Sequence, residues 1–171
     1  MDNKYLLILL LLFIQRGAAQ ENVFEVARKG TLEQAQALMA TDPDVFDTVN
    51  EAGYSPLILA CYRGNNEVAK FIIESGVDIN GSSSMGTPLM AAVVKGNIEI
   101  VKALLEKKAD VNFADANGTT ALIYSVKFQN APILSLLLDH KADKTHKDND
   151  GKTAFEHAVF AGNETIINLL K

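Results

Sequence analysis

The chain has 171 residues, of which 48% are hydrophobic, and its 16 basic and 21 acidic residues give a net charge of −5. This length suits a single domain with a continuous core. The acidic balance disfavours nucleic acid as a partner and provides no attraction to an anionic membrane surface. Because Cys61 is the only cysteine, an internal disulfide is excluded.

The N-terminal segment has the features of a secretory signal peptide. Lys4 supplies a positive charge, residues 5–14 are an apolar run too short to span a bilayer, and residues 17–19 are small. We expect cleavage near Ala19, which removes residues 1–19 and leaves 14 basic and 20 acidic residues, a net charge of −6. The absence of an internal disulfide favours a periplasmic over another secreted location. An uncleaved anchor and a buried N-terminal helix are the alternatives.

A three-residue phrase then returns every 32 or 33 residues. It consists of a hydroxyl residue, a proline or alanine, and an apolar residue, and its hydroxyl residues are Ser55, Thr87, Thr120 and Thr153. A fixed period of this length predicts stacked supersecondary units. In each unit the hydroxyl can cap a first helix, and a following glycine can end that helix in a left-handed conformation. A second helix then follows, with apolar residues at helical spacing at Ile98, Val101, Leu104 and Leu105.

In chain order, the units are expected to differ in how complete they are. We place a degenerate first unit at residues 20–50, full units at 51–82, 83–115 and 116–148, and a truncated unit at 149–171. A terminal unit is expected to be degenerate because one of its faces meets water instead of a neighbour.

Each full unit also closes in a second phrase, such as Gly-Val-Asp-Ile-Asn at residues 76–80 and Lys-Ala-Asp-Val-Asn at residues 108–112. Together the two phrases resemble the ankyrin repeat, over roughly residues 21–171. The resemblance implies an all-α ankyrin-repeat solenoid of helix-turn-helix units with hairpin-like loops. The chain departs from the repeat pattern at Met85, where a turn glycine is expected, and at Gln129, which replaces a glycine between the helices.

The sequence contains no recognisable motif for catalysis or metal binding. His140, His146 and His157 have no zinc-ligand spacing. An apparent calcium loop at residues 146–157 has histidines where the first and twelfth ligands should be acidic, so we interpret its Asp-Asn-Asp-Gly as a turn. We therefore expect no enzymatic activity, no cofactor and no metal. Cys61 is expected to be a buried, inert thiol, and a redox or intermolecular thiol is the alternative.

The resemblance implies a concave surface made by the ends of the first helices and the loop tips. By register, the residues expected to bind a partner there are Tyr54, Tyr62, Arg63, Val94, Lys95, Lys127, Phe128 and Phe160. Aromatic residues and arginine are enriched in binding hot spots. The alternative is that some rings fill the stack. The cations on this surface suit an acidic patch on the partner, and residues 166–170 leave a second, apolar surface at the C-terminal end.

From the resemblance we expect a non-enzymatic protein-binding module, a monomer or weak dimer. It would bind, and inhibit or protect, another exported protein, such as an enzyme, in the periplasm, in a self-protection or accessory role. We expect no nucleic-acid partner and no stable membrane insertion after signal cleavage. The alternatives are a secreted effector that binds a host protein and an enzyme with an unrecognised site.

Overall fold

The structure is a computed structural model that describes residues 23–84 and 86–171. The predicted signal peptide and Met85 therefore lie outside the described residues. The described part of the chain forms helices, joined by turns and loops, with two isolated β-bridges in the loops. None of the described helices is both long enough and apolar enough to cross a membrane.

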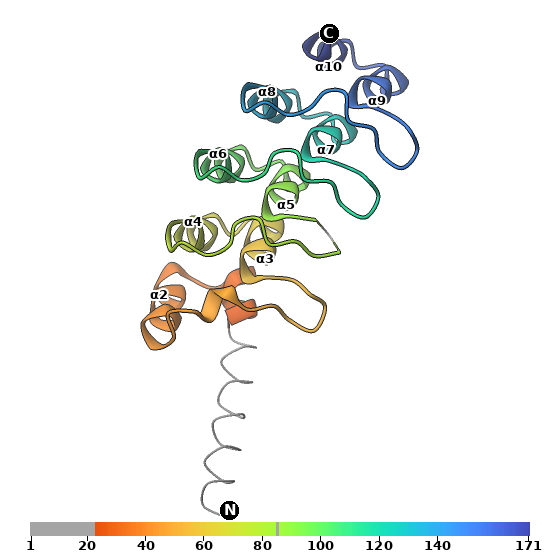
Figure 1. Cartoon of the computed structure of the whole chain (residues 1–171). Helices are drawn as coiled ribbons and strands as arrows, with labels where there is room; N and C mark the ends of the chain where they lie inside the picture. Colours follow the sequence, from red (N-terminus) through yellow and green to blue (C-terminus); the bar gives the residue numbers. More distant parts are fainter. Residues whose placement is uncertain (1–22, 85) are drawn as a thin grey trace, which may run out of the picture.

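The helices are stacked in pairs along one axis, with residues 23–29 and the C-terminus at opposite ends (Figure 1). The first helices of the pairs, here called the inner helices, are residues 23–29, α3 (Pro56–Arg63), α5 (Pro88–Lys95), α7 (Ala121–Lys127) and α9 (Ala154–Ala161). The second helices, here called the outer helices, are α2 (Leu32–Thr41), α4 (Asn66–Glu74), α6 (Ile98–Glu106), α8 (Ala131–Asp139) and α10 (Glu164–Leu170). Long loops leave the outer helices and project on the far side of the inner helices (Figure 1). The first of these loops contains the short 3-10 helix η1 (Val45–Asp47).

Local chemistry explains where the inner helices begin and end. The Ser55 and Thr87 hydroxyls accept hydrogen bonds from backbone amides three residues ahead, and proline occupies the first turn of both helices, where its missing N–H costs nothing. Gly64 and Gly96 then end these helices with φ of 77° and 74°, in the left-handed region that favours glycine. After α7, Gln129 adopts a similar conformation with φ of 53° despite its side chain. The all-α solenoid expected from the sequence is confirmed.

The core runs without interruption between the inner and outer helices. Leu57, Leu89 and Leu122 hold the same position in successive inner helices, and each is only 1% exposed. Of the four apolar residues noted in α6, Val101, Leu104 and Leu105 are buried, whereas Ile98 is 37% exposed; Ile100 is fully buried. Ile98 is the first residue of its helix and lies at the edge of the buried stripe, so neighbouring helices do not cover it.

Side-chain amides also join successive pairs. The Asn65 amide nitrogen donates to the Gly30 carbonyl at 2.9 Å. In the loops, the Asn80 and Asn112 side-chain oxygens each accept a hydrogen bond at 2.8 Å from a backbone amide of the next loop. Since polar groups of adjacent pairs satisfy one another, the relative position of the pairs is set by hydrogen bonds as well as by apolar packing.

Candidate functional site

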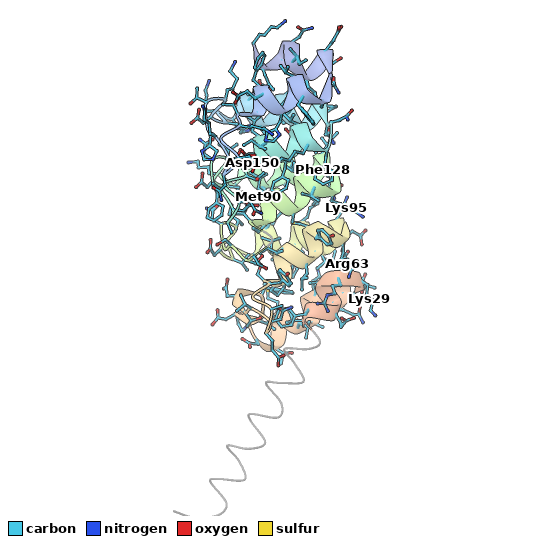
Figure 2. The ribbon with its side chains drawn as sticks, turned by 90° about the vertical axis from the view of Figure 1, so that its right-hand side faces the viewer. Lys29, Arg63, Met90, Lys95, Phe128 and Asp150 are labelled. Atoms are coloured by element: carbon cyan, nitrogen blue, oxygen red, sulfur yellow. The ribbon has the colours of Figure 1, made fainter. Side chains whose placement is uncertain are left out.

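Cations occupy the last position of the first four inner helices. These residues, here called the cationic row, are Lys29, Arg63, Lys95 and Lys127. All four are exposed. Figure 2 shows Lys29, Arg63 and Lys95 following one another along one side of the stack, with Phe128 next in line. The cations form a row because each of these helices ends at its cation. A cation there also interacts favourably with the negative end of the helix dipole.

The members of the cationic row differ in how far they are neutralised. Lys29 lies 3.1 Å from a carboxylate oxygen of Glu25, and the Lys127 ammonium lies 3.6 Å from Asp148. Within the described residues, Arg63 and Lys95 form no ion pair, so their charges remain available to a partner. The Lys95 side chain extends toward the end of α3. The Cε atom of Lys95 lies 3.0 Å from the position that a Cβ added to Gly64 would occupy.

Three aromatic rings predicted to bind a partner are accessible. The exposed fraction is 39% for Tyr62, 54% for Phe128 and 89% for Phe160. The Phe128 ring is tilted against that of Tyr124, with 6.4 Å between centroids. The Lys152 ammonium lies 5.7 Å from the centroid of the Phe160 ring. Exposed rings beside cations provide large apolar area for a partner at little cost in side-chain entropy.

Tyr54 and Val94 are less accessible than the other predicted residues, since both are half-buried. The Tyr54 ring packs against the core, and its hydroxyl lies 3.4 Å from the Ser84 hydroxyl on the next loop. Most of the Tyr54 side chain therefore fills the stack, as the alternative interpretation expected, and only part of it remains accessible to a partner.

The loop tips are held by side chains of a common type. Asn50, Asp115 and Asp148 occupy the same position in three loops, and the side-chain oxygen of each accepts hydrogen bonds from the backbone amides two and four residues ahead. This geometry makes Asp148 a turn-forming residue, as the sequence indicated. Among the described residues, no group of three or more histidine, cysteine, aspartate or glutamate side chains is placed to hold a metal ion.

Asp148 also links its loop to α9 and α7. Its carboxylate is buried and lies 2.6 Å from the His157 Nε2 atom. Burial by itself would raise the pKa of Asp148, but the hydrogen bonds from His157 and the Lys152 backbone, with the nearby Lys127 charge, lower this pKa to about 2. The carboxylate is therefore ionised at neutral pH.

Tyr124 holds the position in α7 that His157 holds in α9. Its hydroxyl donates a 2.6 Å hydrogen bond to Asp115. Burial raises the pKa of Tyr124 to about 12, and the Asp115 carboxylate contributes to the rise. Tyr124 and His157 therefore each hold a loop against an inner helix. The polar atom of each is already hydrogen-bonded to a carboxylate of that loop.

The remaining reactive side chains are either hydrogen-bonded to the backbone or buried. The His146 Nε2–H donates to the Gly118 carbonyl at 2.8 Å, and the His140 Nδ1–H donates to the Leu136 carbonyl at 2.8 Å. The Cys61 side chain is fully buried, and burial raises the pKa of its thiol to about 12. The thiolate that redox chemistry requires is thus disfavoured, which supports the inert assignment for Cys61.

The sequence interpretation missed the basic residues of the first helix. Glu25, Arg28, Lys29 and Arg63 line a surface depression of about 310 Å³ between this helix and α3. Register contained the necessary signal, because Lys29 precedes Gly30 just as Arg63 precedes Gly64.

Comparison with protein-family models agrees with the stacked helix pairs. A family model described as ankyrin repeats, in three copies, matches residues 23–115 and residues 107–171. The two matches together span all of the described residues. Ankyrin repeats are generally protein–protein interaction modules. By its matched sequence and its helical architecture, the chain belongs to the ankyrin repeat family.

Proposed function

We propose that this chain is a non-enzymatic binding module that binds an exported protein in the periplasm and restrains or protects it. The observation that carries the proposal is the accessible set of rings, led by Tyr62 and Phe128, beside Arg63 and Lys95, which form no ion pair with any of the described residues. Full burial of a large apolar side chain contributes roughly 1.5–3 kcal/mol, so a few rings supply much of a stable interface.

The rigidity of the surface supports a binding role. The rings and cations stand on helices whose pairs are joined by side-chain hydrogen bonds, and the loop tips are held by Asn50, Asp115 and Asp148. A preformed surface loses little conformational entropy when it binds, which leaves more of the contact energy for affinity. The location in the periplasm rests on the signal peptide predicted for residues 1–19.

The partner-binding test is a pair of alanine substitutions, Tyr62→Ala with Phe128→Ala, in the mature protein. Affinity capture from the native compartment, followed by mass spectrometry, identifies the partner, and the same capture is repeated with the variant. We expect partner recovery to fall by more than tenfold, with unchanged helical content by circular dichroism. Ile98→Ala, which removes a 37% exposed apolar side chain from an outer helix, is the matched control and should retain capture.

Two results would contradict the proposal. If the double variant unfolds, the rings belong to the core. If it captures the partner as well as the control does, the interface lies elsewhere. The location is tested separately by cell fractionation and by the mass of the mature chain, which should begin at Gln20. Release into the medium instead of retention in the periplasm would favour the secreted effector.

A further inference from the structure

The first four inner helices carry a charge opposite to that of the outer helices, whereas the inner helix α9, which holds Glu156 and no lysine or arginine, has a net charge of −1. The first inner helix holds Glu25, Arg28 and Lys29, and α3, α5 and α7 hold Arg63, Lys95 and Lys127 respectively and no acidic residue, so each of these four helices has a net charge of +1. Each described outer helix has a net charge of −1, because its acidic residues outnumber its lysines by one. A chain that is acidic overall therefore presents a positive stripe on one side.

This separation is maintained by pairing on the outer column. Lys70 lies 2.5 Å from Glu99 and Lys107 lies 2.6 Å from Glu74, so these lysines are neutralised between adjacent repeats. At the centre of the cationic row, Arg63 and Lys95 have no such partner among the described residues. Asp150 is on a loop tip, away from the side on which Arg63 and Lys95 are labelled (Figure 2). At physiological salt the reach of a charge is about 8 Å, so a partner docked on the row responds mainly to the row itself.

The spacing of the row restricts what can pair with it. Helix α3 packs directly on α5, and α5 on α7. Directly packed helices have axes about 8–10 Å apart, so successive cations recur at about this interval. A polyproline II segment has three residues per turn and rises about 3.1 Å per residue, so every third side chain lies on one face at intervals of about 9 Å.

We propose that the cationic row binds an extended acidic segment of a partner protein, in which carboxylates recur at every third residue. The inference rests on the proposed function and adds the chemistry of the partner to it. Carboxylates of the segment pair with Arg63 and Lys95 at the centre. One end extends toward the depression lined by Arg28 and Lys29, and the other toward the exposed ring of Phe128.

The test uses the mature protein and two synthetic peptides of identical composition. The first has glutamate at every third of twelve positions, with proline at half of the others to favour polyproline II, and the second has the same residues with its glutamates in one block. Binding is measured by fluorescence anisotropy at low and physiological salt. We expect the first peptide to bind at least about fivefold more tightly, because only it places a carboxylate opposite each cation.

Substitutions separate the row from the general charge of the protein. Arg63→Ala combined with Lys95→Ala should weaken the first peptide about tenfold, since exposed ion pairs contribute up to about 1 kcal/mol each. Lys102→Ala, which removes an exposed cation from an outer helix, is the matched control and should leave the affinity unchanged. Loss of helical content in the double variant is checked by circular dichroism. If it occurs, Arg63→Gln combined with Lys95→Gln replaces it.

Three outcomes would overturn the inference. The first is that the two peptides bind with equal affinity or that neither binds measurably. The second is that the double variant and Lys102→Ala lose the same amount of affinity for the first peptide. The third is that a single-stranded thymidine 12-mer binds more tightly than the first peptide. The last outcome would indicate a nucleic-acid partner. If the peptides fail while Tyr62→Ala with Phe128→Ala still abolishes partner capture, the proposed function stands and only the acidic segment is wrong.

Discussion

The pair formed by α7 and α8 differs from the pair formed by α9 and α10 in what covers it. Val126 of α7 and Val159 of α9 hold equivalent positions, yet they are 1% and 52% exposed. Leu122 and Phe155 differ in the same way, at 1% and 36%. The inner helix α9 packs on α7, whereas the equivalent side of α9 has no helix against it in the structure (Figure 1). The same residue type at the same position is thus core in one pair and surface in the next.

Two equivalent positions of the outer helices do not show this difference. Ile133 and Ile166 are equivalent and both are fully buried, and Leu137 and Leu170 are 0% and 5% exposed. These side chains are buried without a following pair, because α10 packs on α9 of its own pair and on α8 of the preceding one. A repeat therefore has positions that it buries with its own pair and the preceding one, and positions that only a following pair can bury.

The largest expected contrast comes from truncating the equivalent apolar residues. Leu122→Ala should lower the free energy of unfolding by about 2–5 kcal/mol, because it leaves a cavity between packed repeats. Phe155→Ala, at the partly open position, should cost less than about half as much. Urea denaturation followed by circular dichroism measures both. Equal losses would show that position in the stack does not determine the contribution of these residues.

A second contrast concerns two equivalent loop glycines. Gly118 and Gly151 have φ of 70° and 74°, so alanine is strained at both by about 1–2 kcal/mol. At Gly118 an added Cβ would also lie 3.0 Å from the Asn149 backbone nitrogen, whereas at Gly151 nothing lies within 4 Å. We expect Gly118→Ala to lower the melting temperature several degrees more than Gly151→Ala does. An identical decrease would mean that contact between the loops adds nothing to the backbone strain.

The smallest contrast concerns the loop that precedes α9. Asp148→Asn preserves an oxygen for the turn, as Asn50 shows in the first loop, but it removes the charge that faces His157 and Lys127. We expect a loss of about 1–2 kcal/mol at neutral pH. Asp150→Asn, an exposed substitution in the same loop, should cost less than about 0.5 kcal/mol.

The effect of Asp148→Asn should depend on pH with a definite sign. The folded-state pKa of Asp148, about 2, lies below its ordinary value of 3.8, so the charged form stabilises the fold. Its contribution is complete above about pH 4, declines as the pH falls, and is lost below about pH 2. The difference in unfolding free energy between the wild type and Asp148→Asn should shrink over this range. A difference that is constant with pH would show that the charge of Asp148 does not stabilise the fold.

Register predicted much of the candidate surface but could not rank its residues. Knowing the period was enough to place Tyr62, Arg63, Lys95 and Phe128 near helix ends, where the structure leaves them exposed. The half-burial of Tyr54 was not predictable, because it depends on the core and on Ser84 of the next loop. Lys29 was not among the residues predicted to bind, although the same register places it before Gly30 as Arg63 is placed before Gly64.

By itself, the sequence determined where helices begin and end and where their charges fall. Hydroxyl caps, prolines and left-handed glycines act within a few residues, so they can be recognised in a single repeat. Only the tertiary structure decided which apolar side chains are covered and which polar groups pair, as in the contrast of Val126 with Val159 and in the contact between Asp148 and His157. Burial and pairing depend on neighbouring elements, and the sequence of one repeat does not specify what packs against it.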